Sequence, residues 1–244
     1  MRIRRSTDAD LSEILRWLSD EDARGVDGCF HRNRNVVSGA HQGGKLYVAV
    51  EPSENKAVAF ILGGLYGPEI LAVREEWRRH GVGRQLAEFW LEEAKRRDLC
   101  ALEIQCEPRT SIHFWQAMGF ELYADNYAFK VIEKTFDLPG DAQEVAVTIR
   151  FFPERARWEQ DVEPLMEVSP RAVRLHGGKI ALAERVTFFN RGRRGASCGD
   201  PVVAIEVEGA LVYRDKAKYD EAEALGVKGD SFAFSIDSLS LPAT

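Results

Sequence analysis

The pattern of apolar residues changes in kind near residue 137. Before that point, short strand-like runs alternate with segments whose apolar residues recur at helical spacing. After it, nearly every run is strand-like, as in EVAVTIRFF (144–152) and PVVAIEVEGALVY (201–213), and only 217–225 has helical spacing. The sequence therefore predicts an α+β domain over 1–137 and a small β-rich barrel or sandwich over 138–244, with a linker, DLPGDA (137–142), at the boundary.

The first half has a clear predicted order of elements. Thr7 followed by Asp10 fits a capping box at the start of a helix. Residues 20–44 show no period and are predicted as a helix fragment and loop that line a substrate site. The other predicted elements are strands at 1–5, 45–50, 56–63, 69–73, 100–106 and 120–132, and helices at 82–97 and 110–118.

Composition excludes several classes of protein. The 244 residues carry a net charge of −6, which argues against polyanion binding over the whole surface. No apolar run approaches the ~20 residues of a membrane span, and the N-terminus lacks the apolar segment of a secretory leader. The four cysteines show no CxxC spacing, so neither a zinc finger nor a disulfide framework is expected. We expect reduced thiols in a cytoplasmic protein, and no metal.

The stretch that carries chemistry is a strand, a basic glycine loop and a helix. Arg78, Gly81 and Gly83 fit R-x-x-G-x-G between the strand 69–73 and the helix that follows. Glycines let backbone N–H groups approach an anion closely, and a helix N-terminus adds a positive dipole end. The loop is therefore predicted to hold a phosphate; the alternative is a basic surface turn capped by glycines.

This stretch resembles the GCN5-related N-acetyltransferases, the GNAT family. Its pattern V-x-P-x-[YF]-R-G-x-G-[IV]-G is met in register by Val73, Trp77, Arg78, Gly81, Val82 and Gly83. FWQAMGF (114–120) is similar to the family's F-[YW]-x-x-x-G-F, and TDADL (7–11) to the start of its first helix. The resemblance covers 1–133. It implies a mixed sheet flanked by helices and an enzyme that moves an acetyl group from acetyl-CoA to a primary amine.

The resemblance also implies roles for particular residues. Main-chain groups near Leu71 and Val73 are expected to hydrogen-bond the pantetheine arm of the cofactor. The residues expected to hold its pyrophosphate are Arg78, Arg79, His80, Gly81, Val82, Gly83 and Arg84.

Two departures from the family matter most for the chemistry. Arg79 stands where the family has its first loop glycine, and Trp115 stands where many members have a tyrosine that protonates the leaving thiolate. An indole is no useful acid at neutral pH, so Trp115 is expected to pack against the cofactor arm or the core.

Other side chains must then serve as acid and base. The base candidate is Glu69; the alternative is an exposed carboxylate at a strand end. His113 has a suitable pKa range, and Tyr127 and Tyr123 are candidate acids. The alternatives are a helix-surface histidine and packing aromatics.

The second half offers weaker signals. Arg191, Arg193 and Arg194 form a basic loop that suits phosphate or RNA backbone, or is simply solvated. Gly177 and Lys179 resemble the G-x-K of ASCH/PUA-like barrels, which often meet RNA. Two alternatives to an amine acetyltransferase therefore remain: an enzyme that acetylates tRNA or another nucleic acid, with an RNA-binding second domain, and a non-catalytic acyl-CoA-binding module. No membrane partner is expected, and a homodimer is left open.

Overall fold

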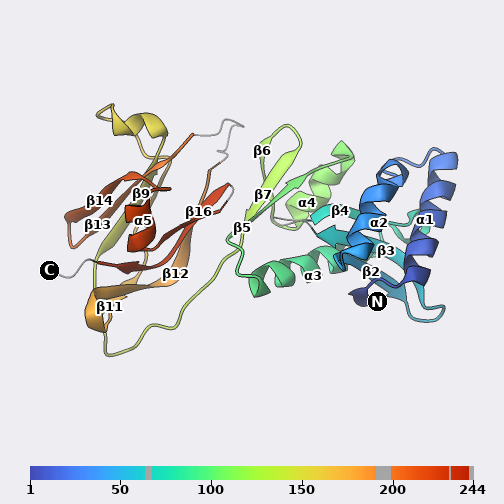
Figure 1. Cartoon of the computed structure of the whole chain (residues 1–244), viewed down its shortest axis with the longest axis horizontal. Coiled ribbons are helices and arrows are strands. Elements are labelled where there is room, and N and C mark those ends of the chain that lie inside the picture. Colours follow the sequence, from blue (N-terminus) through green and yellow to red (C-terminus); the bar gives the residue numbers. More distant parts are fainter. Residues whose placement is uncertain (64–67, 191–198, 231, 242–244) are drawn as a thin grey trace. The chain divides into compact units, whose positions relative to one another are not determined.

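The chain forms two compact units, Met1–Lys130 and Val131–Thr244. The computed structural model describes residues 1–63, 68–190, 199–230 and 232–241. Helices and strands alternate in the first unit, whereas the second consists mostly of strands (Figure 1). The predicted α+β class with a β-rich second half is confirmed.

The N-terminal unit follows the predicted order of elements. Its first helix starts with the expected capping box: the Thr7 side chain accepts from the Asp10 N–H, and the Asp10 carboxylate accepts from the Thr7 N–H at 2.7 Å. The helices are α1 (Asp8–Ala23), α2 (Arg34–Gln42), α3 (Val82–Arg96) and α4 (Ile112–Ala117). The strands are β1 (Arg2–Arg5), β2 (Leu46–Glu51), β3 (Lys56–Gly63), β4 (Pro68–Val73), β5 (Ala101–Gln105), β6 (Glu121–Ala124) and β7 (Tyr127–Val131).

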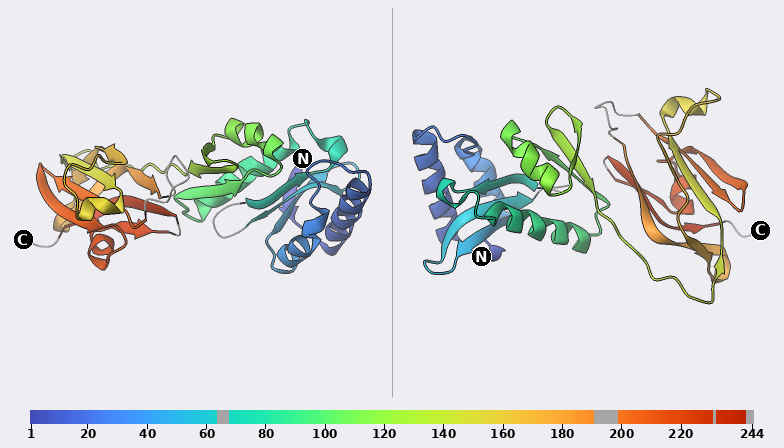
Figure 2. Two further views of the ribbon diagram at one scale, coloured as in Figure 1. Left: turned by 90° about the horizontal axis from the view of Figure 1, so that it is seen from above. Right: turned by 180° about the vertical axis from the view of Figure 1, so that it is seen from behind.

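The larger sheet of this unit is antiparallel, in the order β1-β2-β3-β4, and helices cover both faces (Figures 1 and 2). On one face the Trp17 ring of α1 lies 5.8 Å from Phe60. On the other, Phe89 of α3 lies 5.0 Å from Tyr47. The glycine at position 63 lets α3 pack closely against the sheet, because a Cβ there would overlap the ring of Trp90 on α3. The sheet is thus a rigid support, buried on both sides.

The smaller sheet has the order β5-β7-β6. Among the described residues β4 and β5 are end strands of different sheets and do not pair with each other. Each therefore presents an open backbone edge. Short 3₁₀ turns, Glu75–Trp77 after β4 and Arg109–Ser111 before α4, lead away from these edges.

The C-terminal unit is built from two antiparallel sheets, β10-β9-β13-β14 and β15-β16-β12-β11-β8. Its one α-helix among the described residues is α5 (Asp220–Leu225), near the predicted 217–225. The strands are β8 (Gln143–Glu144), β9 (Val147–Phe152), β10 (Met166–Val168), β11 (Ala172–Arg174), β12 (Lys179–Phe189), β13 (Val202–Val207), β14 (Ala210–Lys216), β15 (Val227–Gly229) and β16 (Ala233–Ser240).

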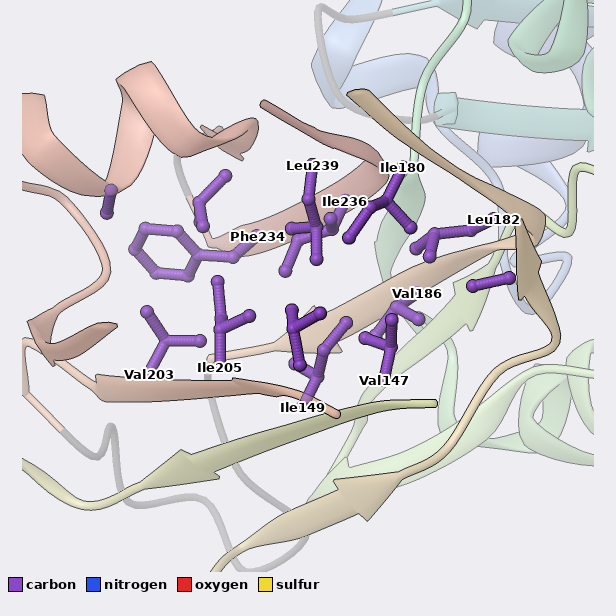
Figure 3. Packing of buried hydrophobic residues seen from close by; sticks show 14 of the residues in the cluster. Val147, Ile149, Ile180, Leu182, Val186, Val203, Ile205, Phe234, Ile236 and Leu239 are labelled. Atoms are coloured by element: carbon purple, nitrogen blue, oxygen red, sulfur yellow. The ribbon is translucent and has the colours of Figure 1, made fainter. Parts of the chain in front are cut away.

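One hydrophobic core fills the space between these two sheets. Figure 3 shows side chains of β12 and β16, such as Ile180 and Ile236, pointing toward Ile149 of β9 and Ile205 of β13. The Phe151 ring stacks on Phe188 of the facing sheet, with centroids 4.5 Å apart. The unit is therefore a two-layer sandwich closed by its own side chains.

The segment between the two units pairs with β12. Thr135 forms a bridge with Glu184, and the Phe136 N–H donates to the carbonyl of Ala183 at 2.8 Å. The linker expected at 137–142 consequently follows backbone that already belongs to the second unit. Whether the units fold independently on either side of residue 138 remains a prediction.

Other expectations concern membranes, metals and thiols. Across the described residues, no helix has both the length and the apolar character needed to cross a membrane. The same residues contain no cluster of three or more histidine, cysteine or acidic side chains placed to hold a metal ion. Cys29 and Cys106 are free thiols, Cys100 is buried, and Cys198 lies outside the described residues.

Candidate active site

A cleft of about 1140 Å³ opens in the N-terminal unit where the two sheets part. Its walls come from β4, β5 and the segments that follow each strand. Residues of the α1–α2 segment, including Phe30 and Asn33, close a third side, as expected for part of 20–44. A volume of this size accommodates a cofactor and a small acceptor together.

The start of α3 forms one end of the cleft. The first helical hydrogen bond runs from the Gln85 N–H to the Gly81 carbonyl, so the amides of residues 82–84 have no helical acceptor. Gly81 is left-handed, with φ +78°, and a Cβ there would meet no atom within 4 Å. The N-cap residue is Gly81, which has no side chain that could cap the helix. This end therefore offers open space beside unpaired N–H groups, which suits an anion.

The loop keeps glycine-like geometry at a position that is not glycine. Arg79 adopts φ +63°, in the left-handed region that side chains seldom enter. The substitution predicted to disturb the family pattern thus changes the side chain but leaves the backbone path suited to glycine. Arg79 and Arg84 both line the cleft and add positive charge at its anion end.

The open edge of β4 runs along the cleft. The Arg74 N–H donates to the Val58 carbonyl, which makes these two a hydrogen-bonded pair of the antiparallel ladder. Since such pairs alternate, Leu71 and Val73 fall at non-hydrogen-bonded positions, and their N–H and C=O groups point away from β3. The N–H and C=O groups of Leu71 and the N–H of Val73 are therefore turned toward the cleft, whereas the Val73 carbonyl accepts a hydrogen bond from Arg78.

Arg78 lies in the cleft wall, but its nitrogens are occupied by the protein. Its Nε donates to the Val73 carbonyl at 3.0 Å and its Nη1 to the Asp27 carbonyl at 2.9 Å. Its Nη2 lies 3.4 Å from a carboxylate oxygen of Glu21. We interpret the Arg78 side chain as a brace between three segments rather than as the phosphate ligand expected from the motif.

Glu21 is the partner that sequence analysis missed. It is 1% exposed, on α1, and its carboxylate also accepts the Glu75 N–H at 2.7 Å. Burial raises the pKa of this carboxyl above its usual value, although the Glu75 N–H and Arg78 act in the opposite direction. A polar residue on the apolar side of the predicted helix was the only signal that marked it.

Acidic residues also line the cleft. Glu69 is exposed at the start of β4, and Asp27 and Glu107 line the same cavity. Glu107 accepts a hydrogen bond from Asn126 at 2.9 Å. Negative charge here favours a cationic acceptor, such as an ammonium group.

The wall formed by α4 is aromatic. Trp115 is 8% exposed and lies in edge contact with Phe114 and Phe120 at 5.0 and 5.2 Å. One helical turn earlier, the buried Ser111 hydroxyl has no hydrogen-bond partner among the described residues. Both residues line the cleft. Trp115 is packed as a structural aromatic, while Ser111 keeps an unused donor.

A comparison with protein families bears directly on this region. Residues 42–122 match the family model described as an acetyltransferase (GNAT) domain. The predicted resemblance is confirmed. The match includes the α3 loop, the open edge of β4 and the aromatic wall of α4, whereas the α1–α2 residues that line the cleft lie before it.

Solved structures similar to the chain include several acetyltransferases. A GNAT-family acetyltransferase from Staphylococcus aureus has 8% identity, covering 54% of this chain and 98% of that one, with a TM-score of 0.43. A ribosomal-protein-alanine N-acetyltransferase from Brucella melitensis has 20% identity, 54% and 99% coverage and a TM-score of 0.42. A GNAT N-acetyltransferase from Escherichia coli, solved with CoA, has 18% identity, 54% and 81% coverage and a TM-score of 0.42. No curated protein matches the chain.

Two of the three catalytic candidates lie away from the lining of the GNAT cleft. Glu69 lines it. His113 is exposed on α4 and absent from the lining, because its side chain leaves the helix on another face from Phe114 and Trp115. Tyr127 packs beside Tyr123, with centroids 6.1 Å apart, and the Tyr123 hydroxyl donates to Glu103. These tyrosines are placed as packing aromatics of the smaller sheet.

Two residues of the predicted phosphate loop also lie outside the lining. Val82 is 2% exposed and belongs to the core, so only its amide is available to a ligand. The His80 Nδ1 lies 2.9 Å from the Arg78 carbonyl, and its ring faces Trp77. The remaining expected cofactor residues line the cleft: Leu71, Val73, Arg78, Arg79, Gly81, Gly83, Arg84 and Trp115.

The candidates of the second half stay predictions. The basic loop with Arg191, Arg193 and Arg194 lies outside the described residues. Gly177 lies in a turn before β12, which begins at Lys179. Arg185, which follows the G-x-K position, is buried and pairs with Asp237 at 2.6 Å. Nothing in this arrangement bears on the resemblance to ASCH/PUA-like barrels.

Proposed function

We propose that the protein transfers an acetyl group from acetyl-CoA to a primary amine in this cleft. One observation carries the proposal: a single cavity joins an uncapped helix N-terminus, an open strand edge and a group of carboxylates. The first two suit the diphosphate and pantetheine of CoA, and the third suits the acceptor.

The donor would be held mainly by backbone. Amides of Val82, Gly83 and Arg84 point into the anion end, and Leu71 and Val73 offer main-chain groups along β4. When bound, acetyl-CoA supplies a thioester, whose C–S bond breaks as the amine forms a C–N bond. Backbone binding explains why the site tolerates arginine at position 79, since an amide does not depend on its side chain.

Glu69 is the base candidate that the geometry favours. An ammonium group must lose a proton before its nitrogen can act as a nucleophile. The Glu69 carboxylate is exposed within the cleft and able to accept that proton. Since Trp115 donates no proton, the leaving thiolate takes its proton from water, with the Ser111 hydroxyl as a further hydrogen-bond donor in the same wall.

A second candidate function is a non-catalytic acyl-CoA-binding module. The observation that favours it is Trp115, which stands where many relatives have their acidic tyrosine. Binding and turnover measured on one preparation separate the two candidates. Acetyl-CoA is titrated by calorimetry, and thiol release is followed over a panel of amines.

Thiol release that depends on an amine supports the enzyme, and Glu69→Gln should reduce it by ~10²–10⁴-fold, as loss of a general base does. Glu121→Gln is the matched control, because Glu121 is also an exposed carboxylate near the start of a strand but does not line the cleft. Binding without release for any amine favours the module. Absence of acetyl-CoA binding overturns both.

The acceptor, its chemical class and a cytoplasmic location remain predictions. Labelled acetyl-CoA incubated with protein and lysate, followed by mass spectrometry of the small-molecule, protein and RNA fractions, identifies the acceptor. Label in RNA would support the nucleic-acid role predicted for the second half.

A further inference from the structure

Glu21 and Arg78 connect the two functional ends of the cleft. Glu21 lies on α1, ahead of the segment whose residues Asp27–Asn33 form one wall. Arg78 begins the anion loop. Their side chains meet at 3.4 Å beneath the cleft, where Glu21 is almost fully buried.

Every nitrogen of Arg78 is committed to a different segment. Nε holds the carbonyl of Val73 at the end of β4, and Nη1 holds the carbonyl of Asp27 in the α1–α2 wall. Nη2 faces Glu21, which in turn accepts the backbone N–H of Glu75 ahead of the loop. A planar guanidinium with donors in a fixed fork is suited to bridge three acceptors, whereas an ammonium is not.

We propose that Glu21 is a positioning residue which, through Arg78, couples occupancy of the anion loop to order in the wall formed by residues 24–33. This proposal rests on the proposed function, because the anion is taken to be the CoA diphosphate. Cofactor binding fixes the anion loop, the fixed loop holds Arg78, and Arg78 holds the carbonyl of Asp27. Donor binding therefore makes more rigid a wall whose contact with Arg78 is already formed without it.

The test uses hydrogen exchange of the full-length protein with and without CoA, so it does not require a known acceptor. In the unaltered protein, CoA should slow amide exchange in residues 24–33 by about tenfold or more, as ordering of a weakly protected segment does. In Glu21→Gln this effect should fall below about threefold. Glutamine keeps one oxygen as the acceptor for the Glu75 N–H, and removes both the charge and the acceptor that face Arg78.

Two further variants exclude simpler explanations. Glu13→Gln is the matched control: Glu13 is a carboxylate of α1 that pairs with Arg16 and Arg74 but does not line the cleft. It should respond to CoA like the unaltered protein. Arg78→Lys keeps the positive charge and loses the fork, so it should behave like Glu21→Gln. A phosphate ligand would instead retain most of its effect as lysine.

The outcomes separate this proposal from the proposed function. Slowing of exchange near the anion loop in every variant, with residues 24–33 equally protected in Glu21→Gln and the unaltered protein, overturns the coupling and leaves CoA binding standing. No change of exchange anywhere on adding CoA to the unaltered protein overturns the proposed function itself.

Discussion

Each unit pairs two antiparallel sheets, but the two units use the space between sheets differently. In the C-terminal unit, facing sheets are joined by packed side chains such as Phe151 on Phe188. In the N-terminal unit, the sheets part at β4 and β5 and leave a cleft bordered by backbone edges. The C-terminal unit is stabilised by a filled space between its sheets, whereas the N-terminal unit keeps an open space in which backbone groups of β4 such as those of Leu71 face the cleft.

The largest expected effect is a loss of stability from a substitution in the core between the two C-terminal sheets. Phe151→Ala removes a fully buried ring and should lower the free energy of unfolding by about 3–5 kcal/mol. If the units are separable, only one of two thermal transitions shifts, and acetyl-CoA affinity measured below that transition stays unchanged. Leu211→Ala, at a position 57% exposed, is the control and should change stability by less than about 0.5 kcal/mol.

Calorimetric scans with and without acetyl-CoA check this prediction. One cooperative transition that shifts as a whole, with loss of cofactor affinity, would show that the second unit supports the cleft. The proposed boundary near residue 138 would then have no functional meaning.

The next largest effect is a loss of acetyl-CoA affinity when a side chain occupies the cleft. A Cβ at Gly83 would lie 3.5 Å from Val73 and 3.6 Å from Phe114, both of which line the cleft. A glutamate side chain fits at the backbone but extends into the anion end with the wrong charge. Gly83→Glu should weaken acetyl-CoA binding by at least about 100-fold, and the fold should survive because acids are favourable in a first helical turn.

Calorimetric titration with circular dichroism as a check on folding tests this expectation. Gly39→Glu is the matched control, since Gly39 lies on α2 with open space at its Cβ position. Equal affinity in both variants and the unaltered protein would remove the anion site from the α3 loop.

A smaller effect is expected at Trp115. Trp115→Phe keeps a packed aromatic and should reduce turnover by less than about tenfold, because the indole is not an acid. Trp115→Tyr adds a phenol in the cleft wall and should keep or raise turnover. A loss of about 100-fold in Trp115→Phe, with CoA affinity intact, would assign the indole N–H a role in the transition state.

The loop predicted to hold an anion lies at one end of the cleft, whereas sequence analysis named few of the other residues that line it. The loop could be predicted because glycine geometry, strand and helix are adjacent in sequence, as Gly81 and Gly83 show. The acceptor side joins Asp27, Glu69 and Glu107 from segments far apart in the chain. His113 was expected in the cleft because one turn of a short helix does not reveal which face is buried.

The contact between Glu21 and Arg78 could not be predicted from the sequence for a related reason. A carboxylate in a predicted helix is expected to be exposed to solvent unless its partner is known. Here the partner, Arg78, lies 57 residues later, and both were brought together by the packing of α1. The motif identified Arg78 as a residue of the loop, but not the protein groups that its nitrogens contact.

The smallest effect concerns the backbone of the anion loop itself. Arg79 holds φ +63°, a conformation that costs a side-chain-bearing residue about 1–2 kcal/mol and costs glycine little. Glycine also gives the unfolded chain more freedom, which offsets about 0.4–1 kcal/mol of the gain. Arg79→Gly should therefore stabilise the N-terminal unit by about 0.5–1 kcal/mol relative to Arg79→Ala.

Both variants remove the same charge, so both should weaken acetyl-CoA binding equally. Urea unfolding and calorimetric titration of the pair measure the two quantities separately. Equal stability of the two variants would mean that the loop relaxes when position 79 changes. The unpaired amides at the start of α3 would then not be held in place by this turn before an anion binds.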